Sequence, residues 1–303
     1  MSNEIKFTVG ISVQEGIKMK IQLSEHFTYK KLIRFTIPTI IMMIFTSLYG
    51  IVDGIFVSNC VGSDAFAAVN LIMPAIMIVG SIGFMVGTGG SALVSKTLGE
   101  GNKKKANEYF SMLLYLLIIV GLLFTIIGIL LVEAISKLLG ANGNILTDCI
   151  TYGKVLLIFL VPFVLQICFQ SFVIVAEKPT FGLVISVAAG IANMILDFLF
   201  MYVFKMGVLG AGLATGISQV IGAIIPIIYF ARKNNSLLQL VKAKFEWNAI
   251  IKTCINGSSE MVSNISMSIV TFLYNIQMKK LVGEDGVAEI TVILYVNFIF
   301  ISI

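Results

Sequence analysis

Charged residues are scarce in this chain: Asp, Glu, Lys and Arg make up 12% of its 303 residues, against about 25% in an average soluble domain. Apolar residues supply 58%, and the mean hydropathy is +0.99. A soluble fold has no use for that much apolar sequence. We therefore predict an all-α membrane protein that crosses the bilayer several times. The meaning of its net charge of +5 then depends on the side of the membrane on which the basic residues lie, and no nucleic-acid partner is expected.

Histidine and cysteine are also rare. His26 is the only histidine, and Cys60, Cys149, Cys168 and Cys254 show neither a CxxC pair nor metal-ligand spacing. We expect no metal site and no redox centre. Since HExxH and GxGD motifs are absent as well, we do not expect an enzyme. Cys60 and Cys149 both fall near outer helix ends, so a disulfide is one option, but we favour free thiols.

Seven apolar segments are long enough to cross a bilayer, which takes about 20 helical residues. They are 32–60, 66–95, 109–132, 149–175, 180–204, 208–231 and 248–276, and an eighth begins near 287. With the N-terminus inside, 16 of the 21 basic residues fall on the cytoplasmic side, the exceptions being Lys137, Lys154, Lys205, Lys279 and Lys280. This excess predicts a multi-pass protein of a bacterial plasma membrane with a cytoplasmic N-terminus. No cleavable signal precedes the first span, and we expect translation to start at Met19.

A weak internal repeat links the segments that follow the first and seventh spans. "VGSDAFAAV" at 61–69 and "VGEDGVAEI" at 282–290 are offset by 221 residues. An even number of spans per copy makes such a repeat parallel. We therefore predict a cytoplasmic segment at 1–31, a six-helix N-lobe at 32–231, a cytoplasmic inter-lobe loop at 232–247 and the start of a C-lobe at 248–303. The chain would then stop partway through its second half.

Three acidic residues lie deep in predicted spans, and two of them share a depth. Asp53 in "GIVDGIF" and Asp197 in "NMILDFLF" each lie seven residues before the outer end of a span, and Thr215 lies seven after one. Each is therefore about 10 Å below the outer membrane edge. Asn193 precedes Asp197 by four and shares its helix face. This oxygen-rich set predicts a cation or proton site; the alternative is interhelical hydrogen bonding that only stabilises packing.

Five other polar or special residues are weaker candidates. The third acid, Glu260 in "GSSEMVSNISMS", lies near mid-membrane among Ser and Asn residues. Tyr49 lies one turn from Asp53, whereas Gln166 and Gln170 share one face of the fourth span and could line a pocket. Pro38 removes a backbone hydrogen bond and should bend the first span.

Three glycines in the sixth span, in "GAGLATG", are predicted to be close-packing positions rather than ligands. Small residues let the backbones of membrane helices approach one another. They are Gly210, Gly212 and Gly216.

Several blocks together resemble one transporter family. "LYGIVDGIFVSNCVGSDAFAAVNLIMP", "ANMILDFLFMYVFKMGVLGAGLATGISQ" and "GSSEMVSNISMS" resemble the bacterial-type multidrug and toxic compound extrusion (MATE) transporters, from about residue 24 onward. The resemblance implies twelve spans in two lobes around a central cavity, and export of amphipathic, often cationic compounds in exchange for Na⁺ or H⁺. It departs at "VIVAEKPTF", where relatives commonly carry a basic residue and a glycine. It also implies roles for single residues: a cation site at Asp53, Asn193, Asp197 and Thr215 with Tyr49 nearby, an acidic position at Glu260 and a bending proline at Pro38.

The leading hypothesis is therefore a secondary efflux antiporter, with Na⁺ or H⁺ as coupling ion and no other cofactor. Its expected partners are small organic substrates and membrane lipid, and the full-length protein is expected to be a monomer. A flippase of lipid-linked saccharides is the alternative. The predicted spans hold almost none of the basic residues that such a flippase uses. A purely structural membrane protein would leave three buried acids without a role.

Overall fold

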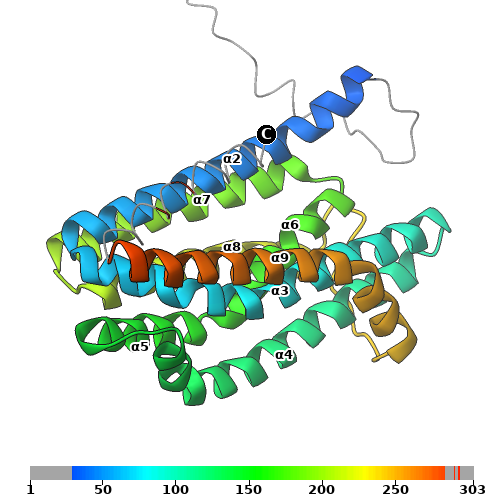
Figure 1. Ribbon diagram of the computed structural model, residues 1–303. Helices are drawn as coiled ribbons and strands as arrows, with labels where there is room; N and C mark the ends of the chain where they lie inside the picture. The colour runs from blue at the N-terminus through cyan, green and yellow to red at the C-terminus, as the bar shows by residue number, and fades with distance from the viewer. Residues whose placement is uncertain (1–28, 284–289, 291–292, 294–303) are drawn as a thin grey trace, which may run out of the picture.

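The computed structural model describes residues 29–283 together with Ile290 and Ile293, and this part of the chain is helical without any strand. The all-α prediction is confirmed. Residues 1–28 of the predicted N-terminal segment and most of the eighth predicted span lie outside the described residues. The elements are α2 (Tyr29–Cys60), α3 (Ser63–Gly99), α4 (Lys103–Leu138), α5 (Gly143–Ile158), α6 (Leu160–Val175), α7 (Pro179–Asp197), the π-helical turn η1 (Phe198–Val203), α8 (Val208–Ala231) and α9 (Trp247–Leu281) (Figure 1).

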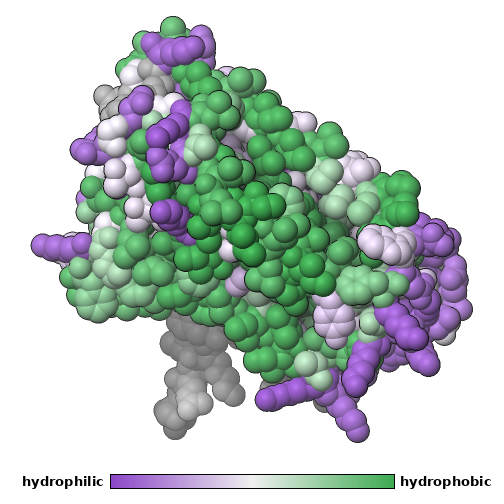
Figure 2. Space-filling view, turned by 90° about the horizontal axis from the view of Figure 1, so that it is seen from below, coloured by the Kyte–Doolittle hydropathy of each residue, from purple (hydrophilic) through white to green (hydrophobic). Residues whose placement is uncertain are grey.

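Within the described residues, five helices are long and apolar enough to cross a membrane, and the bent pair α5–α6 makes a sixth. The five are α2, α3, α4, α7 with η1, and α8. The seventh predicted span forms α9, which is 35 residues long but is not among the sufficiently apolar helices. Figure 2 shows apolar side chains across the middle of one face and hydrophilic side chains gathered at its two ends, as expected for a protein surrounded by lipid.

The fourth predicted span, 149–175, is wrong as a single helix. The chain forms two helices, α5 and α6, that are bent by 60° at Phe159. Pro162 explains the break, because its ring has no N–H to donate and would clash with the carbonyl of Ile158, the last residue of α5. The Thr125 hydroxyl of α4 donates to the Leu157 carbonyl over 2.9 Å and so satisfies a carbonyl at the bend.

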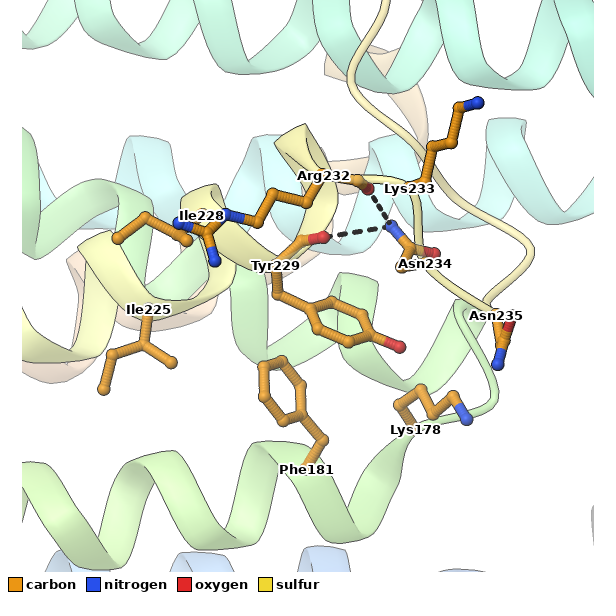
Figure 3. Close-up of a pocket in the computed structure, with 9 residues that line it drawn as sticks. All are labelled: Lys178, Phe181, Ile225, Ile228, Tyr229, Arg232, Lys233, Asn234 and Asn235. Carbon is orange, nitrogen blue, oxygen red and sulfur yellow. Dashed lines mark hydrogen bonds between the residues drawn. The ribbon is translucent and has the colours of Figure 1, made fainter.

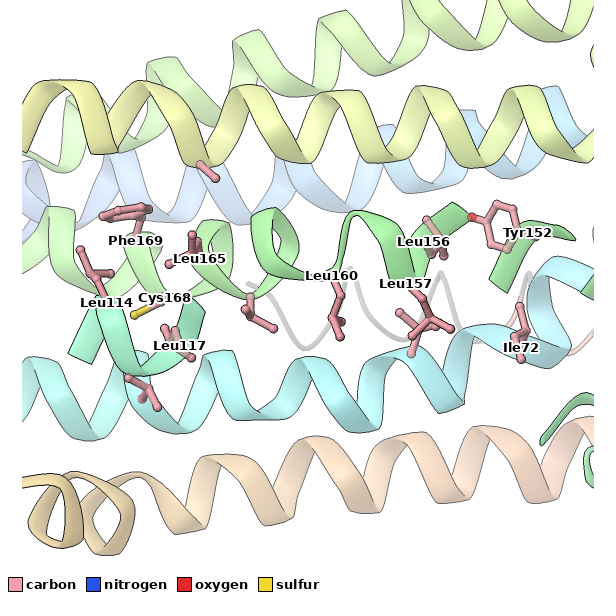
Figure 4. Packing of buried hydrophobic residues seen from close by; sticks show 14 of the residues in the cluster. Ile72, Leu114, Leu117, Tyr152, Leu156, Leu157, Leu160, Leu165, Cys168 and Phe169 are labelled. Atoms are coloured by element: carbon pink, nitrogen blue, oxygen red, sulfur yellow. The ribbon is translucent and has the colours of Figure 1, made fainter. Parts of the chain in front are cut away.

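The bundle has α3 near its centre, in contact with α4, α5, α6 and α9. Figure 4 shows buried side chains of α4, α5 and α6 between these helices and α3. Phe110 anchors this core from α4, with its ring 4.9 Å from that of Phe172 and 5.2 Å from that of Phe230. On the other side, α7 packs against both α2 and α8, which places the two predicted acidic spans next to each other.

The three glycines of α8 are close-packing positions, as predicted. A Cβ at Gly216 would overlap the Phe159 ring, and one at Gly212 would lie 3.0 Å from Val155. At Gly210 a Cβ would lie 3.0 Å from Phe200. These contacts hold α8 against the α5–α6 bend and against η1.

The segment between α8 and α9 spans residues 232–246 and is tied to α4. The Gln239 amide donates to the Asn107 Oδ1 over 3.1 Å, and the Val241 amide donates to the Ser111 hydroxyl over 2.8 Å. The ammonium group of Lys105 forms an ion pair with Glu246. These contacts hold the predicted inter-lobe loop along the start of α4.

Two glycines that correspond under the 221-residue offset have similar conformations. Gly62 follows the end of α2 and has a φ of 119°, and Gly283 follows the end of α9 with a φ of 91°. Both values lie in the region that glycine adopts without strain. The parallel repeat remains a prediction, and this pair is consistent with it.

Candidate functional site

The structure brings the two predicted carboxylates together. Asp53 lies on α2 and Asp197 at the end of α7, two helices that pack side by side (Figure 1). Their carboxyl groups are close enough to interact directly. Asp197 is 0% exposed, and Asp53 is partly buried. The two carboxylates for which the sequence predicted equal depth therefore lie next to each other.

The predicted amide lies on α7, and the predicted hydroxyl lies on the neighbouring helix α8. Asn193 is 1% exposed and lies one turn before Asp197 on α7. Thr215 lies on α8, which packs against α7. The side-chain oxygens of Asn193 and Thr215, one oxygen of Asp53 and both oxygens of Asp197 are buried without a hydrogen-bond partner among the described residues.

Gln219 is a further polar residue that the sequence reasoning missed. It lies four residues after Thr215 on α8, and its Oε1 is also buried without a partner in the described part of the chain. The spacing of four was visible in "ATGISQ", and it puts both side chains on one face of the helix. We add Gln219 to the candidate site on this ground.

Tyr49 lies where α2 meets α7. A Cβ on Gly190 would lie 3.1 Å from the Tyr49 ring and 2.6 Å from the Phe45 ring, so only glycine allows this approach. Because Gly190 is one turn before Asn193, the phenol ring lies beside the candidate site. Pro38 lies inside α2, which continues as one helix from Tyr29 to Cys60.

A π-helical turn begins directly after Asp197. In η1 the Phe204 amide donates to the Leu199 carbonyl five residues back, over 2.8 Å. Such turns are rare and occur often at functional sites, because they interrupt the regular hydrogen-bond ladder of a helix. Here the turn follows a buried carboxylate.

Gln166 and Gln170 line a narrow crevice between four helices. Its other walls include Met42 of α2, Ser186 of α7 and Gly222 of α8. Met42 and Ser186 each lie eleven residues from the carboxylate on the same helix, which corresponds to about 16 Å along the helix axis. The glutamines therefore face the space between α2, α6, α7 and α8 (the inter-helix column), as the carboxylate-bearing helices do, but they lie well away from the carboxylates along the helix axes.

Glu260 is not part of this group in the described chain. It lies on α9, a helix packed along α3, and its side chain is exposed. Its carbonyl accepts a hydrogen bond of 2.8 Å from the Asn264 side chain. Glu260 is exposed on α9, and the structure does not join it to Asp53 and Asp197.

The arrangement suits a small hard cation or a proton. Carboxylate, amide and hydroxyl oxygens are the ligands that hard cations prefer. Oxygens buried without a partner are costly, and two neighbouring carboxylates repel each other when both are charged. A proton or Na⁺ between Asp53 and Asp197 would remove both penalties.

A family model described as MatE matches residues 38–199. This match covers more than half of the chain. The chain belongs to the MatE family. The matched region runs from Pro38 of α2 into η1, so it contains Asp53, Asn193 and Asp197, whereas Thr215, Gln219 and Glu260 lie beyond it.

Individual relatives agree with this membership. The multidrug export protein MepA of Staphylococcus saprophyticus is 28% identical over 207 residues, which are 68% of this chain and 46% of the relative. Among solved structures, a MOP superfamily transporter from Pyrococcus furiosus matches with a TM-score of 0.81 at 26% identity, over 92% of this chain and 64% of that one. An outward-facing MATE family transporter matches with a TM-score of 0.80 at 26% identity, over 89% and 60% of the two chains.

The MatE-family chain described here spans about half the length of the curated relatives that it matches. The solved MATE structures confirm a membrane-transporter fold for its helices. The bacterial origin of the membrane and the orientation of the chain in it stay predictions.

Proposed function

We propose that this chain forms the first lobe of a secondary antiporter that exports amphipathic or cationic organic compounds in exchange for Na⁺ or H⁺. The observation that carries the proposal is the group of buried, unpartnered oxygens around Asp53 and Asp197. The names of the relatives, multidrug export protein and MATE family transporter, supply the direction of transport and the class of substrate. We further propose a monomer in a bacterial plasma membrane, with the N-terminus in the cytoplasm.

The chemistry of exchange follows from competition for the two carboxylates. A Na⁺ or a shared proton relieves the repulsion between Asp53 and Asp197. An organic cation, or a helix movement that accompanies its binding, would displace that ion. The energy for repeated cycles is available, because one charge that crosses 100 mV of membrane potential yields about 2.3 kcal/mol.

The remaining polar residues fit this cycle. Tyr49 offers an aromatic ring beside the site, which is a favourable surface for an organic cation. Gln166 and Gln170 supply amides to the crevice in the same inter-helix column. We propose that Glu260, exposed on α9, serves a second lobe that packs against that face.

A flippase of anionic lipid-linked saccharides is the weaker proposal. Such a substrate needs basic residues in the cavity, and the described column between α2, α6, α7 and α8 presents carboxylates, amides and hydroxyls instead. For the Pyrococcus furiosus relative, the reported reverse polarity of the binding pocket suggests a different function. The polarity of the pocket is thus the property that separates the two proposals.

The test is ion-linked stabilisation of the purified 303-residue chain in lipid nanodiscs. A ligand that binds only the folded state at 100 times its Kd stabilises that state by about 2.7 kcal/mol. We expect Na⁺, or protonation in its absence, to raise the unfolding temperature, and a lipophilic cation such as tetraphenylphosphonium to reduce that rise. No dependence on either ion, or a dependence that survives replacement of both aspartates by asparagine, would overturn the proposed site.

A further inference from the structure

A second cavity lies at the end of the bundle that carries the α8–α9 segment. Its volume is about 550 Å³. It lies between the start of α7 and the end of α8 (Figure 3). Asp197 of the carboxylate site lies at the other end of α7. Three of its lining residues are basic, and none of the nine described lining residues is acidic: Lys178, Phe181, Ile225, Ile228, Tyr229, Arg232, Lys233, Asn234 and Asn235.

The lining changes from apolar to basic along one helix. Ile225 and Ile228 lie three residues apart on one face of α8, and Arg232, four residues after Ile228, follows directly after the last residue of the helix. The step from Ile225 to Arg232 covers about 10 Å along the helix axis. Ile225 and Ile228 are exposed, at 38% and 46%, and α8 is apolar enough to span a membrane. This order matches that of a phospholipid, with an acyl chain below a charged headgroup.

The floor and the rim of the cavity are firmly built. The rings of Phe181 and Tyr229 lie 4.4 Å apart and join α7 to α8. The Asn234 side chain donates to the carbonyls of Tyr229 and Arg232 over 3.0 and 3.2 Å, and it accepts a hydrogen bond of 2.9 Å from the Ser236 amide. This turn holds Arg232 and Lys233 at the mouth of the cavity. Figure 3 shows Lys178, Asn235 and the Tyr229 hydroxyl on one side of it, and the Arg232 side chain lying back over Ile228.

We propose that this cavity binds the headgroup of an anionic phospholipid. The long side chains of the three basic residues, which point in different directions in Figure 3, would turn toward the phosphate. The Tyr229 hydroxyl and the Asn235 amide would donate hydrogen bonds to phosphate or glycerol oxygens, and an acyl chain would lie along Ile225 and Ile228. Basic pockets between membrane helices are suited to such headgroups. The site is independent of the ion exchange proposed for Asp53 and Asp197.

The test measures lipid binding to the 303-residue chain. Purified protein in detergent is titrated with phosphatidylglycerol or phosphatidylcholine, and bound lipid is counted by native mass spectrometry. We expect a saturable phosphatidylglycerol site. Combined replacement by K178Q, R232Q and K233Q should weaken it about a hundredfold, since each basic group near an anionic surface contributes roughly fivefold. The single variant K178Q should lose about fivefold, which keeps the test open if the triple variant misfolds.

A control variant removes the same charge elsewhere at this end of the bundle. Lys103, Lys104 and Lys244 are exposed there and do not line the cavity. K103Q, K104Q and K244Q together should leave phosphatidylglycerol binding unchanged. The proposal is overturned if both triple variants lose binding equally, if phosphatidylcholine binds as well, or if inorganic phosphate competes at the concentration of the lipid. The last result would assign the cavity to a free phosphate group instead.

Discussion

At the scale of single residues, the candidate site combines groups that proteins normally keep apart. Each buried polar atom without a partner costs about 1–3 kcal/mol. Asp53, Asn193, Asp197, Thr215 and Gln219 all carry such atoms within one region between α2, α7 and α8. A fold tolerates this concentration where an ion completes the site.

The first prediction concerns the two carboxylates. Asp53→Asn and Asp197→Asn should each abolish the ion-dependent rise in unfolding temperature, because each removes half of the charge that holds the ion. The double variant should be little worse than either single one, since residues that act as one site are not additive. Thermal unfolding in nanodiscs across Na⁺ concentration and pH measures all three variants.

The matched control is Asp148→Asn, at a carboxylate outside this group, and it should respond as the unaltered chain does. Additive losses in the Asp53 and Asp197 double variant would show two independent sites.

The second prediction concerns Gln219. Gln219→Ala removes one ligand oxygen and should weaken Na⁺ or lipophilic-cation binding by about 1 kcal/mol, or roughly fivefold. Ser218→Ala is the neighbouring control, because the Ser218 hydroxyl already donates to the Thr215 carbonyl over 2.7 Å. Equal Kd values for Gln219→Ala and the unaltered chain would remove Gln219 from the site.

Residue types and depth were enough to predict part of this site. Asp53 and Asp197 stood out because carboxylates are costly in lipid, and counting residues to the helix ends put them at one level. The position of Glu260 relative to them could not be obtained in this way. Depth gives height along the membrane normal, whereas the neighbour of a helix depends on packing, and α9 packs along α3.

At the scale of elements, the contact of α3 with α9 depends on two glycines. Cβ atoms built on Gly89 and Gly257 would overlap the backbone of the opposite helix, at Thr253 and Met85 respectively. One further contact lies along the same pair of helices, where the Asn275 side chain donates to the Asn70 carbonyl over 3.1 Å.

The third prediction follows from this crossing. Gly89→Ala and Gly257→Ala should force α9 away from α3 and cost about 1–3 kcal/mol of stability. Disulfide cross-linking between cysteines placed at Asn70 and Asn275 should fall in both variants. Gly99→Ala is the control, because nothing lies within 4 Å of a Cβ built there. Unchanged cross-linking in the Gly89 and Gly257 variants would show that the helices are not in backbone contact.

The bend between α5 and α6 shows where hydropathy fails as a predictor. Residues 149–175 are predominantly apolar, so their composition predicts one span. The local effect of Pro162 on the Ile158 carbonyl, together with the support of Thr125, decides that there are two helices. By contrast, the ends of α2 and α8 could be predicted closely, because polar or glycine-containing segments follow both.

At the scale of the whole molecule, the orientation in the membrane sets which way an exchange would run. The ends of α3 and α8 and the starts of α4, α7 and α9 lie at one end of the bundle, and the α4–α5 connection lies at the other. Most basic residues belong to the first end, which the distribution of charge predicts to be cytoplasmic.

The fourth prediction tests this orientation. Cysteines placed at the exposed positions Lys103 and Lys233 should not react with an impermeant thiol reagent in intact cells, whereas one at the exposed position Asn142 should react. The background carries Cys60→Ser and Cys254→Ser, because the other two cysteines are buried. The reverse pattern of labelling would show that the chain has the opposite orientation in the membrane.

The central claim is that Asp53 and Asp197 together hold one proton or one Na⁺, and infrared difference spectroscopy of the chain in lipid bilayers tests it most directly. Adding Na⁺, or raising the pH in its absence, should remove the carbonyl band of one protonated carboxylic acid and produce a carboxylate band. Neither change should occur in Asp53→Asn or Asp197→Asn, and both should persist in Asp148→Asn. A carboxyl signal that is missing from the unaltered chain, or that remains in both site variants, would contradict the claim.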